Sequence, residues 1–71
     1  MIKNPKIGDI AYAIDKWRDL KAIYAISIDD IIDDKIIDYN YEVEYNVKDC
    51  YDNLEEAIEK LLKYQLEIII V

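Results

Sequence analysis

Apolar and polar residues alternate from residue 37 to residue 45, which predicts a half-buried β-strand. The apolar and aromatic positions would face a core under a helix, and the positions between them carry carboxylates and an amide. These two sets are Ile37, Tyr39, Tyr41, Val43 and Tyr45, and Asp38, Asn40, Glu42 and Glu44. Residues on one side of a strand lie about 7 Å apart, so the pattern predicts a row of negative charge along the exposed side.

The N-terminal part of the chain fits two patterns. Ile10, Tyr12 and Ile14 alternate with smaller or polar residues as in a strand, yet the same segment also has the apolar spacing of a helix capped by Asp9. We favour a strand for two reasons. The charged cluster at residues 15–19 is typical of a turn, and the predicted strand downstream needs partners.

A further strand is predicted between residues 21 and 32. Ser27 followed three residues later by Asp30 also fits the start of a helix there, so this alternative stays open. Two hydrophobic runs are then separated by the residues 33–35, Asp-Asp-Lys, which favours a hairpin. No Gly and no Asn-Gly pair fixes the type of this turn.

The clearest predicted element is a helix from Leu54 to about Gln65. Asn53 is a typical N-cap, and Glu56 stands three residues on as its reciprocal partner. One apolar stripe follows at helical spacing, formed by Leu54, Ala57, Ile58, Leu61, Leu62 and Leu66, and it requires a sheet to cover it. A short pairing segment is predicted around residues 50–51, and a final strand at residues 67–71.

These elements predict a single α+β domain over residues 1–71, with a small twisted antiparallel sheet and one helix in the C-terminal half. The segment 7–14, Ile-Gly-Asp-Ile-Ala-Tyr-Ala-Ile, resembles the first strand of small SH3-like barrels. The segment 50–57, which leads into the helix, is similar to compact proteins of phages and mobile elements that have this barrel. The resemblance implies an SH3-like barrel and a phage-encoded protein, such as an anti-defence or anti-CRISPR factor.

The amino-acid composition limits the catalytic and metal-binding groups that the chain can offer. The chain is 54% hydrophobic and 35% charged, which is typical of a folded protein. Histidine is absent, so the usual general base and the commonest metal ligand are missing. Cys50 is the only cysteine and has no partner for an intramolecular disulfide, so we expect it to be buried, in a cytoplasmic protein or in the host cytoplasm if a phage encodes it. We expect no enzymatic activity, no cofactor and no metal.

Charge provides the lead for function, because nearly all of the net −7 lies between residues 29 and 44. The carboxylates there are Asp29, Asp30, Asp33, Asp34, Asp38, Glu42 and Glu44, and Lys35 is the one base among them. Such a surface repels nucleic acid and membranes but imitates a polyanion toward a basic groove. We therefore predict a protein-binding factor that inhibits a nucleic-acid-binding machine through this acidic surface. Calcium binding is disfavoured, because the spacing and the Gly of a calcium loop are missing.

The alternative is an interaction or oligomerisation module in which the acids serve solubility only. Trp17 and Arg18 are adjacent, and both residue types are enriched at interface hot spots. In this interpretation Trp17 and the tyrosines make the contact with the partner. The sequence leaves open whether the protein is a monomer or a homodimer.

Overall fold

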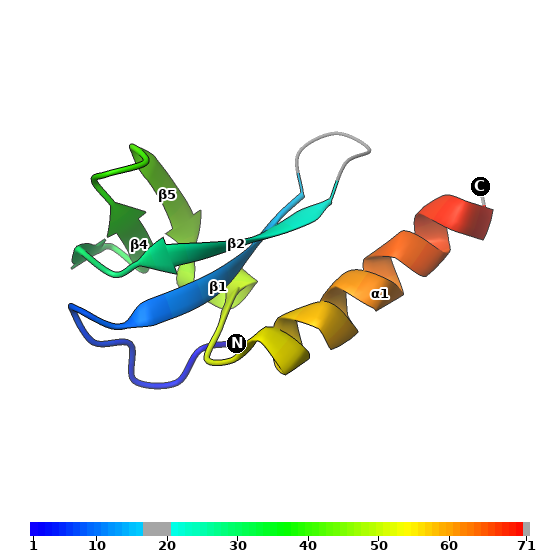
Figure 1. Cartoon of the computed structure of the whole chain (residues 1–71), viewed down its shortest axis with the longest axis horizontal. Coiled ribbons are helices and arrows are strands. Elements are labelled where there is room, and N and C mark those ends of the chain that lie inside the picture. Colours follow the sequence, from blue (N-terminus) through cyan, green and yellow to red (C-terminus); the bar gives the residue numbers. More distant parts are fainter. Residues whose placement is uncertain (17–20, 71) are drawn as a thin grey trace.

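The computed structural model describes residues 1–16 and 21–70, with side chains as far as residue 63. In this part of the chain the strands are β1 (Ile10–Asp15), β2 (Ala22–Ser27), β3 (Asp30–Ile32), β4 (Lys35–Asp38), β5 (Val43–Asn46) and β6 (Cys50–Tyr51). A 3₁₀ helix, Val47–Asp49, leads into β6, and the α-helix α1 (Leu54–Ile70) follows (Figure 1). Trp17 and Arg18 lie outside the described residues.

The strands form two antiparallel sheets. The first sheet has the order β2-β1-β6 and the second has the order β3-β4-β5. Residues 28–29 connect β2 to β3, so the chain changes its pairing partner from β1 to β4 across this short link. The predicted α+β class with one helix is confirmed. The sheet is divided in two, however, and in the described residues the two parts do not close into a barrel.

The first sheet is the middle layer of the molecule. Because side chains alternate between the faces of a strand, β1 directs Ala11 and Ala13 toward the second sheet and Ile14 toward α1. The core between the sheets comprises Ile2, Ala11, Ala13, Ile26, Ile28, Ile36 and Cys50. The smaller core under the helix comprises Ile14, Tyr51 and Ala57. In Figure 1 the helix starts beside β1 and then extends past the sheet.

The N-terminal strand prediction is confirmed, since residues 10–15 pair antiparallel with residues 22–27. The strand predicted between residues 21 and 32 is divided into β2 and β3, which pair with different strands. The hairpin at the Asp-Asp turn is also confirmed. Asp33 and Asp34 have φ angles of 49° and 63°, so both occupy the left-handed region that a two-residue turn of this kind requires. Asp tolerates this region better than most residues, which explains how the turn forms without Gly.

The helix begins as predicted but ends later. The Asn53 Oδ1 accepts the Glu56 N–H at 2.9 Å, which confirms the N-cap. The helical backbone continues to Ile70, so the prediction of a strand from residue 67 is wrong for residues 67–70; Val71 is outside the described part. The physical reason is that the sequence offers no Gly or Pro after Leu54 to stop the helix.

Two isoleucines of the second sheet provide a test of the core. Ile36 is fully buried, whereas Ile32 is 46% exposed. We expect Ile36→Val to lower the free energy of unfolding by about 1 kcal/mol, because one buried methyl group is lost. Ile32→Val should change it by less than about 0.5 kcal/mol. Urea denaturation measures both, and equal losses would contradict the assignment of Ile36 to the core.

Candidate interaction surfaces

Asp38 is fully buried, although the sequence places it in an exposed acidic row. Its Oδ2 accepts the backbone N–H of Ser27 at 2.9 Å. Its Oδ1 accepts the backbone N–H groups of Asn40 at 2.9 Å and Tyr41 at 3.2 Å. This carboxylate therefore joins the end of β2 to the chain that follows β4.

The predicted continuous strand from residue 37 to residue 45 is wrong for this reason. Residues 39–42 form a turn between β4 and β5, and the Asp38 side chain holds the turn by bonding the N–H groups two and three residues ahead. Glu42 completes the turn with a φ of 55°. In β4, Ile36 and Asp38 share the inward face, which is one residue out of the predicted register.

Neighbouring carboxylates support the same turn. Asp29 Oδ2 accepts the Tyr39 N–H at 2.8 Å, and Asp29 Oδ1 accepts the Ser27 hydroxyl at 3.1 Å. Asp30 Oδ2 accepts the Tyr39 hydroxyl at 2.8 Å, and this bond raises the pKa of Tyr39. Both aspartates are thus engaged in the fold, and their side chains are only partly exposed.

The pKa of Asp38 lies below its ordinary value. The chief cause is the Ser27 N–H, and the N–H groups of Tyr41 and Asn40 add to it, while burial acts in the opposite direction. A lowered pKa means that the folded protein binds fewer protons than the unfolded chain near pH 4. The stability that Asp38 contributes is therefore complete above its ordinary pKa of 3.8 and is lost as the pH falls through the folded value.

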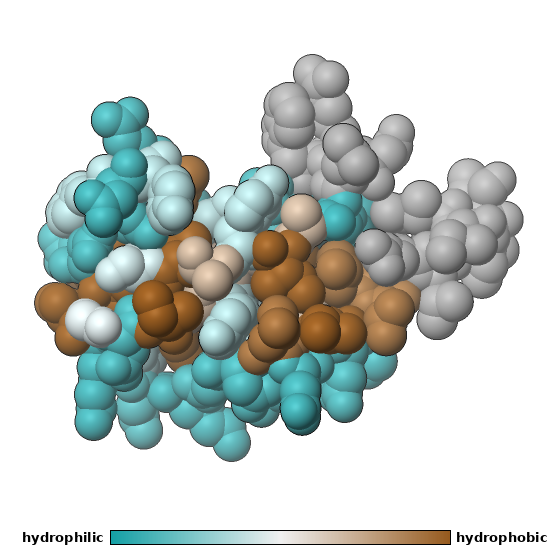
Figure 2. Space-filling model, viewed as in Figure 1, coloured by the Kyte–Doolittle hydropathy of each residue, from teal (hydrophilic) through white to brown (hydrophobic). Residues whose placement is uncertain are grey.

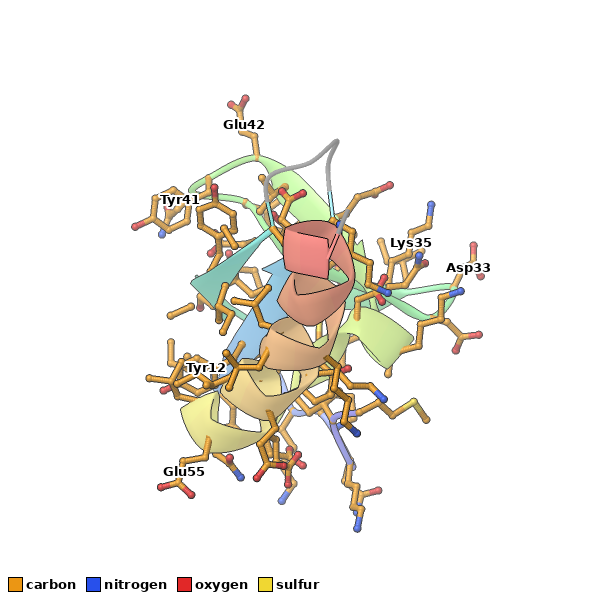
Figure 3. All side chains as sticks on the ribbon, turned by 90° about the vertical axis from the view of Figure 1, so that its right-hand side faces the viewer. Tyr12, Asp33, Lys35, Tyr41, Glu42 and Glu55 are labelled. Carbon is orange, nitrogen blue, oxygen red and sulfur yellow. The ribbon has the colours of Figure 1, made fainter. Side chains whose placement is uncertain are left out.

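The exposed acids do not form one row. Asp33, Asp34, Glu42 and Glu44 are exposed, and Glu44 is paired with the Lys35 Nζ at 3.2 Å. In Figure 3 Asp33 and Lys35 lie on the right, whereas Glu42 projects at the top, so the two turns of the second sheet present their acids in different directions. The predicted acidic surface is therefore divided between two ends of this sheet.

A groove of about 460 Å³ opens between β2 and β5. Its lining consists of Asp15, Tyr24, Ala25, Ile26, Tyr41, Val43 and Tyr45, and we call it the tyrosine groove. Tyr24 is 50% exposed and Tyr41 is 71% exposed, so two rings stand at its rim. The Tyr45 hydroxyl donates to Asp15 Oδ2 at 3.0 Å, and burial, followed by this bond, raises the pKa of Tyr45.

The position of the tyrosines corrects another prediction. Tyr39, Tyr41 and Tyr45 were expected under the helix, but Tyr39 is 58% exposed in the turn. Tyr45 packs on the core between the two sheets, on the side of the first sheet opposite to α1. The prediction failed because residues 39–42 form a turn, and because Tyr45 faces the core between the two sheets and not the separate core under α1.

The helix leaves much of its apolar stripe uncovered. Ala57 is fully buried, but Leu54, Ile58 and Leu62 are 47%, 40% and 52% exposed. A band of hydrophobic residues accordingly crosses the face shown in Figure 2, over the first sheet and α1. Of the predicted apolar stripe, Ala57 and Leu61 therefore pack against the sheet, while its other described residues remain exposed.

Cys50 is buried, as predicted, and its thiol faces the core between the sheets. Burial, with a smaller effect of the Asp49 charge, raises the pKa of this thiol to about 12, so it is protonated at neutral pH. Among the described residues no group of three or more His, Cys, Asp or Glu side chains is arranged to hold a metal ion. No helix in this part of the chain is long and apolar enough to cross a membrane.

Comparison with known proteins identifies no relative. No protein family, no curated protein and no solved structure matches the chain.

The role of the buried Asp38 carboxylate can be tested by substitution, with the exposed Asp33 as a matched control. Asp38→Asn keeps the shape of the side chain but replaces one acceptor oxygen with a donor, which leaves a buried N–H without its partner. We expect the melting temperature at pH 7 to fall by about 10 °C. Asp33→Asn removes the same charge from an exposed turn position, and it should change the melting temperature by only about 2 °C.

The pH dependence makes this test more specific. The difference in stability between wild type and Asp38→Asn should shrink as the pH falls below 3.8, because protonation converts one acceptor oxygen of the wild type into a donor as well. Thermal unfolding followed by circular dichroism between pH 7 and pH 2 measures this difference. A constant difference over the whole range would contradict the role assigned to the ionised carboxylate.

Proposed function

We propose that the chain is a non-enzymatic protein-binding module that contacts its partner through the tyrosine groove. The observation that carries this proposal is the pair of exposed residues, Tyr24 and Tyr41, in the lining of one groove. Tyrosine is enriched among the residues that dominate binding energy, and it loses little conformational entropy on binding. Such a groove fits a protein partner, for example an extended segment with apolar side chains.

The backbone beside the groove is ordered before a partner arrives. Tyr24 belongs to a strand paired along its length with β1, and the backbone of Tyr41 is held by Asp38. Tyr45 is held at the floor by Asp15. Segments whose backbone is already ordered lose less entropy when they bind, so this arrangement supports a recognition surface.

A second candidate is the inhibitor predicted from charge. In this proposal the chain is a phage-encoded protein, such as an anti-CRISPR, and its acidic surface occupies the basic groove of a host nucleic-acid-binding machine. Four exposed carboxylates, Asp33, Asp34, Glu42 and Glu44, and the net charge of −7 support it. Asp38 takes no part in this version, because its carboxylate is buried.

The SH3-like interpretation of the fold is also a proposal. Two features support it: the chain passes from β2 to β3 while changing its pairing partner, and a 3₁₀ helix joins β5 to a last strand that pairs with β1. We likewise propose a cytoplasmic location, which the free buried thiol of Cys50 supports, because reducing compartments preserve thiols.

One capture experiment separates the two functions. The wild type and two variants are immobilised, and the proteins bound from a lysate of the source organism are quantified by mass spectrometry. One variant carries Tyr24→Ser and Tyr41→Ser. The other carries Asp33→Asn, Asp34→Asn, Glu42→Gln and Glu44→Gln, which preserve the shapes of the side chains.

If the groove binds the partner, the tyrosine variant should lose at least about 90% of the captured protein, while the neutralised variant retains it at high salt. Loss in the neutralised variant alone, together with competition by DNA or RNA, would contradict the groove and support the inhibitor. Circular dichroism of both variants controls for folding.

A further inference from the structure

The edge strands of the two sheets differ in how well they are protected from pairing with another strand. The outer edge of β6 is covered by the N-terminal segment, because the Ile2 N–H donates to the Cys50 carbonyl at 2.6 Å. The edge strands β3 and β5 are short and carry the charged residues Asp30 and Glu44. Charges and short length discourage pairing with another strand. β2 has six residues, Ala-Ile-Tyr-Ala-Ile-Ser, with neither a charge nor a proline.

The hydrogen-bonding direction of each residue in β2 follows from its neighbours. The Ile28 N–H donates to the Asp9 carbonyl on the β1 side, and the Ser27 N–H points the other way, to Asp38. Directions alternate along an antiparallel strand, so the N–H and C=O groups of Ile23 and Ala25 point outward. In the described part of the chain these outward groups have no backbone or side-chain partner.

We propose that a second copy of this chain pairs its own β2 with this edge, in antiparallel orientation. The symmetric register places Tyr24 opposite Tyr24 of the second copy. Ile23 of each copy then lies opposite Ala25 of the other, and both residues have outward N–H and C=O groups. The strand is therefore complementary to itself, and the two first sheets would form one continuous sheet.

The tyrosine groove lies along the same edge and provides the space for this contact. Tyr24 and Ala25 belong both to β2 and to the lining of the groove, which has a volume of about 460 Å³. Opposed residues of paired strands share one face, so Tyr24 of the second copy would enter the groove beside Tyr24. Aromatic rings in such pairs attract each other beyond the burial of their area. The inference rests on the proposed function, because it uses the same groove.

β2 carries no charged residue, so no charge of this strand would oppose its copy. Most of the net charge lies between residues 29 and 44. Two molecules of net charge −7 repel each other at long range, and salt screens this repulsion. Self-association should thus strengthen when NaCl is added, whereas binding of a basic partner to the acidic surface should weaken.

Sedimentation velocity on the full chain tests the inference, at increasing protein concentration and in low and moderate NaCl. We expect a monomer–dimer equilibrium at submillimolar concentration that shifts toward dimer with salt. Tyr24→Lys should weaken the association by about tenfold or more, because it places like charges opposite each other in the paired strands. Ile32→Lys is the matched control, since it adds the same charge at a site of similar exposure, 46% against 50%, and it should leave the association unchanged.

A second measurement addresses the hydrogen bonds directly. Ala25→Pro removes an outward N–H without breaking the ladder to β1, and it should abolish the dimer while circular dichroism stays native. In the wild type, hydrogen exchange of the Ile23 and Ala25 amides should slow as the protein concentration rises. If Ala25→Pro fails to fold, the Tyr24→Lys comparison and the exchange rates decide.

Two results would overturn the inference. One is a chain that stays monomeric at millimolar concentration in both salts, and the other is a dimer that Tyr24→Lys and Ile32→Lys affect equally. If the monomeric chain still captures a different protein through Tyr24 and Tyr41, the proposed function stands and only the second copy is wrong.

Discussion

The buried carboxylate of Asp38 is the constraint on which the arrangement of the second sheet depends. A charge removed from water is costly unless strong hydrogen bonds replace its hydration. Here three backbone N–H groups, from Ser27, Asn40 and Tyr41, supply these bonds. Satisfying the carboxylate requires β2, β4 and the turn after β4 to meet at one point, so one polar group fixes how the two sheets connect.

The tyrosine groove follows from this geometry. The turn that Asp38 holds presents Tyr41 and starts β5, which carries Val43 and Tyr45 to the first sheet. Tyr45 then reaches Asp15 on β1. The tyrosine groove thus depends on Asp38, a buried residue that is not part of the groove lining. The neighbouring Asp29 and Asp30 also have structural roles, because their carboxylates accept hydrogen bonds within the fold.

Local signals in the sequence predicted much of the fold. The Asn53 cap, the alternation in β1 and the Asp-Asp turn are each contained within a few residues, and each is confirmed. The register of β4 was not predictable in this way. Ile36 and Ile37 are adjacent and equally apolar, so periodicity alone cannot decide which of them faces the core.

The candidate sites were predictable only in part. The spacing of Asp38 and Asn40 is compatible with a side chain that bonds a backbone N–H two residues ahead, and this was the available sign that the strand ends there. The charge cluster indicated an acidic surface but not its division between two turns. The groove joins residues from β1, β2, the turn and β5, and such convergence is a property of tertiary packing.

The most direct test of the role of Asp38 is a pH titration of its carboxyl carbon by NMR. We expect a folded-state midpoint below 3.8, with the amide protons of Ser27, Asn40 and Tyr41 shifting at the same midpoint. A carboxyl group that titrates at or above 3.8, with those amides unaffected, would contradict this role.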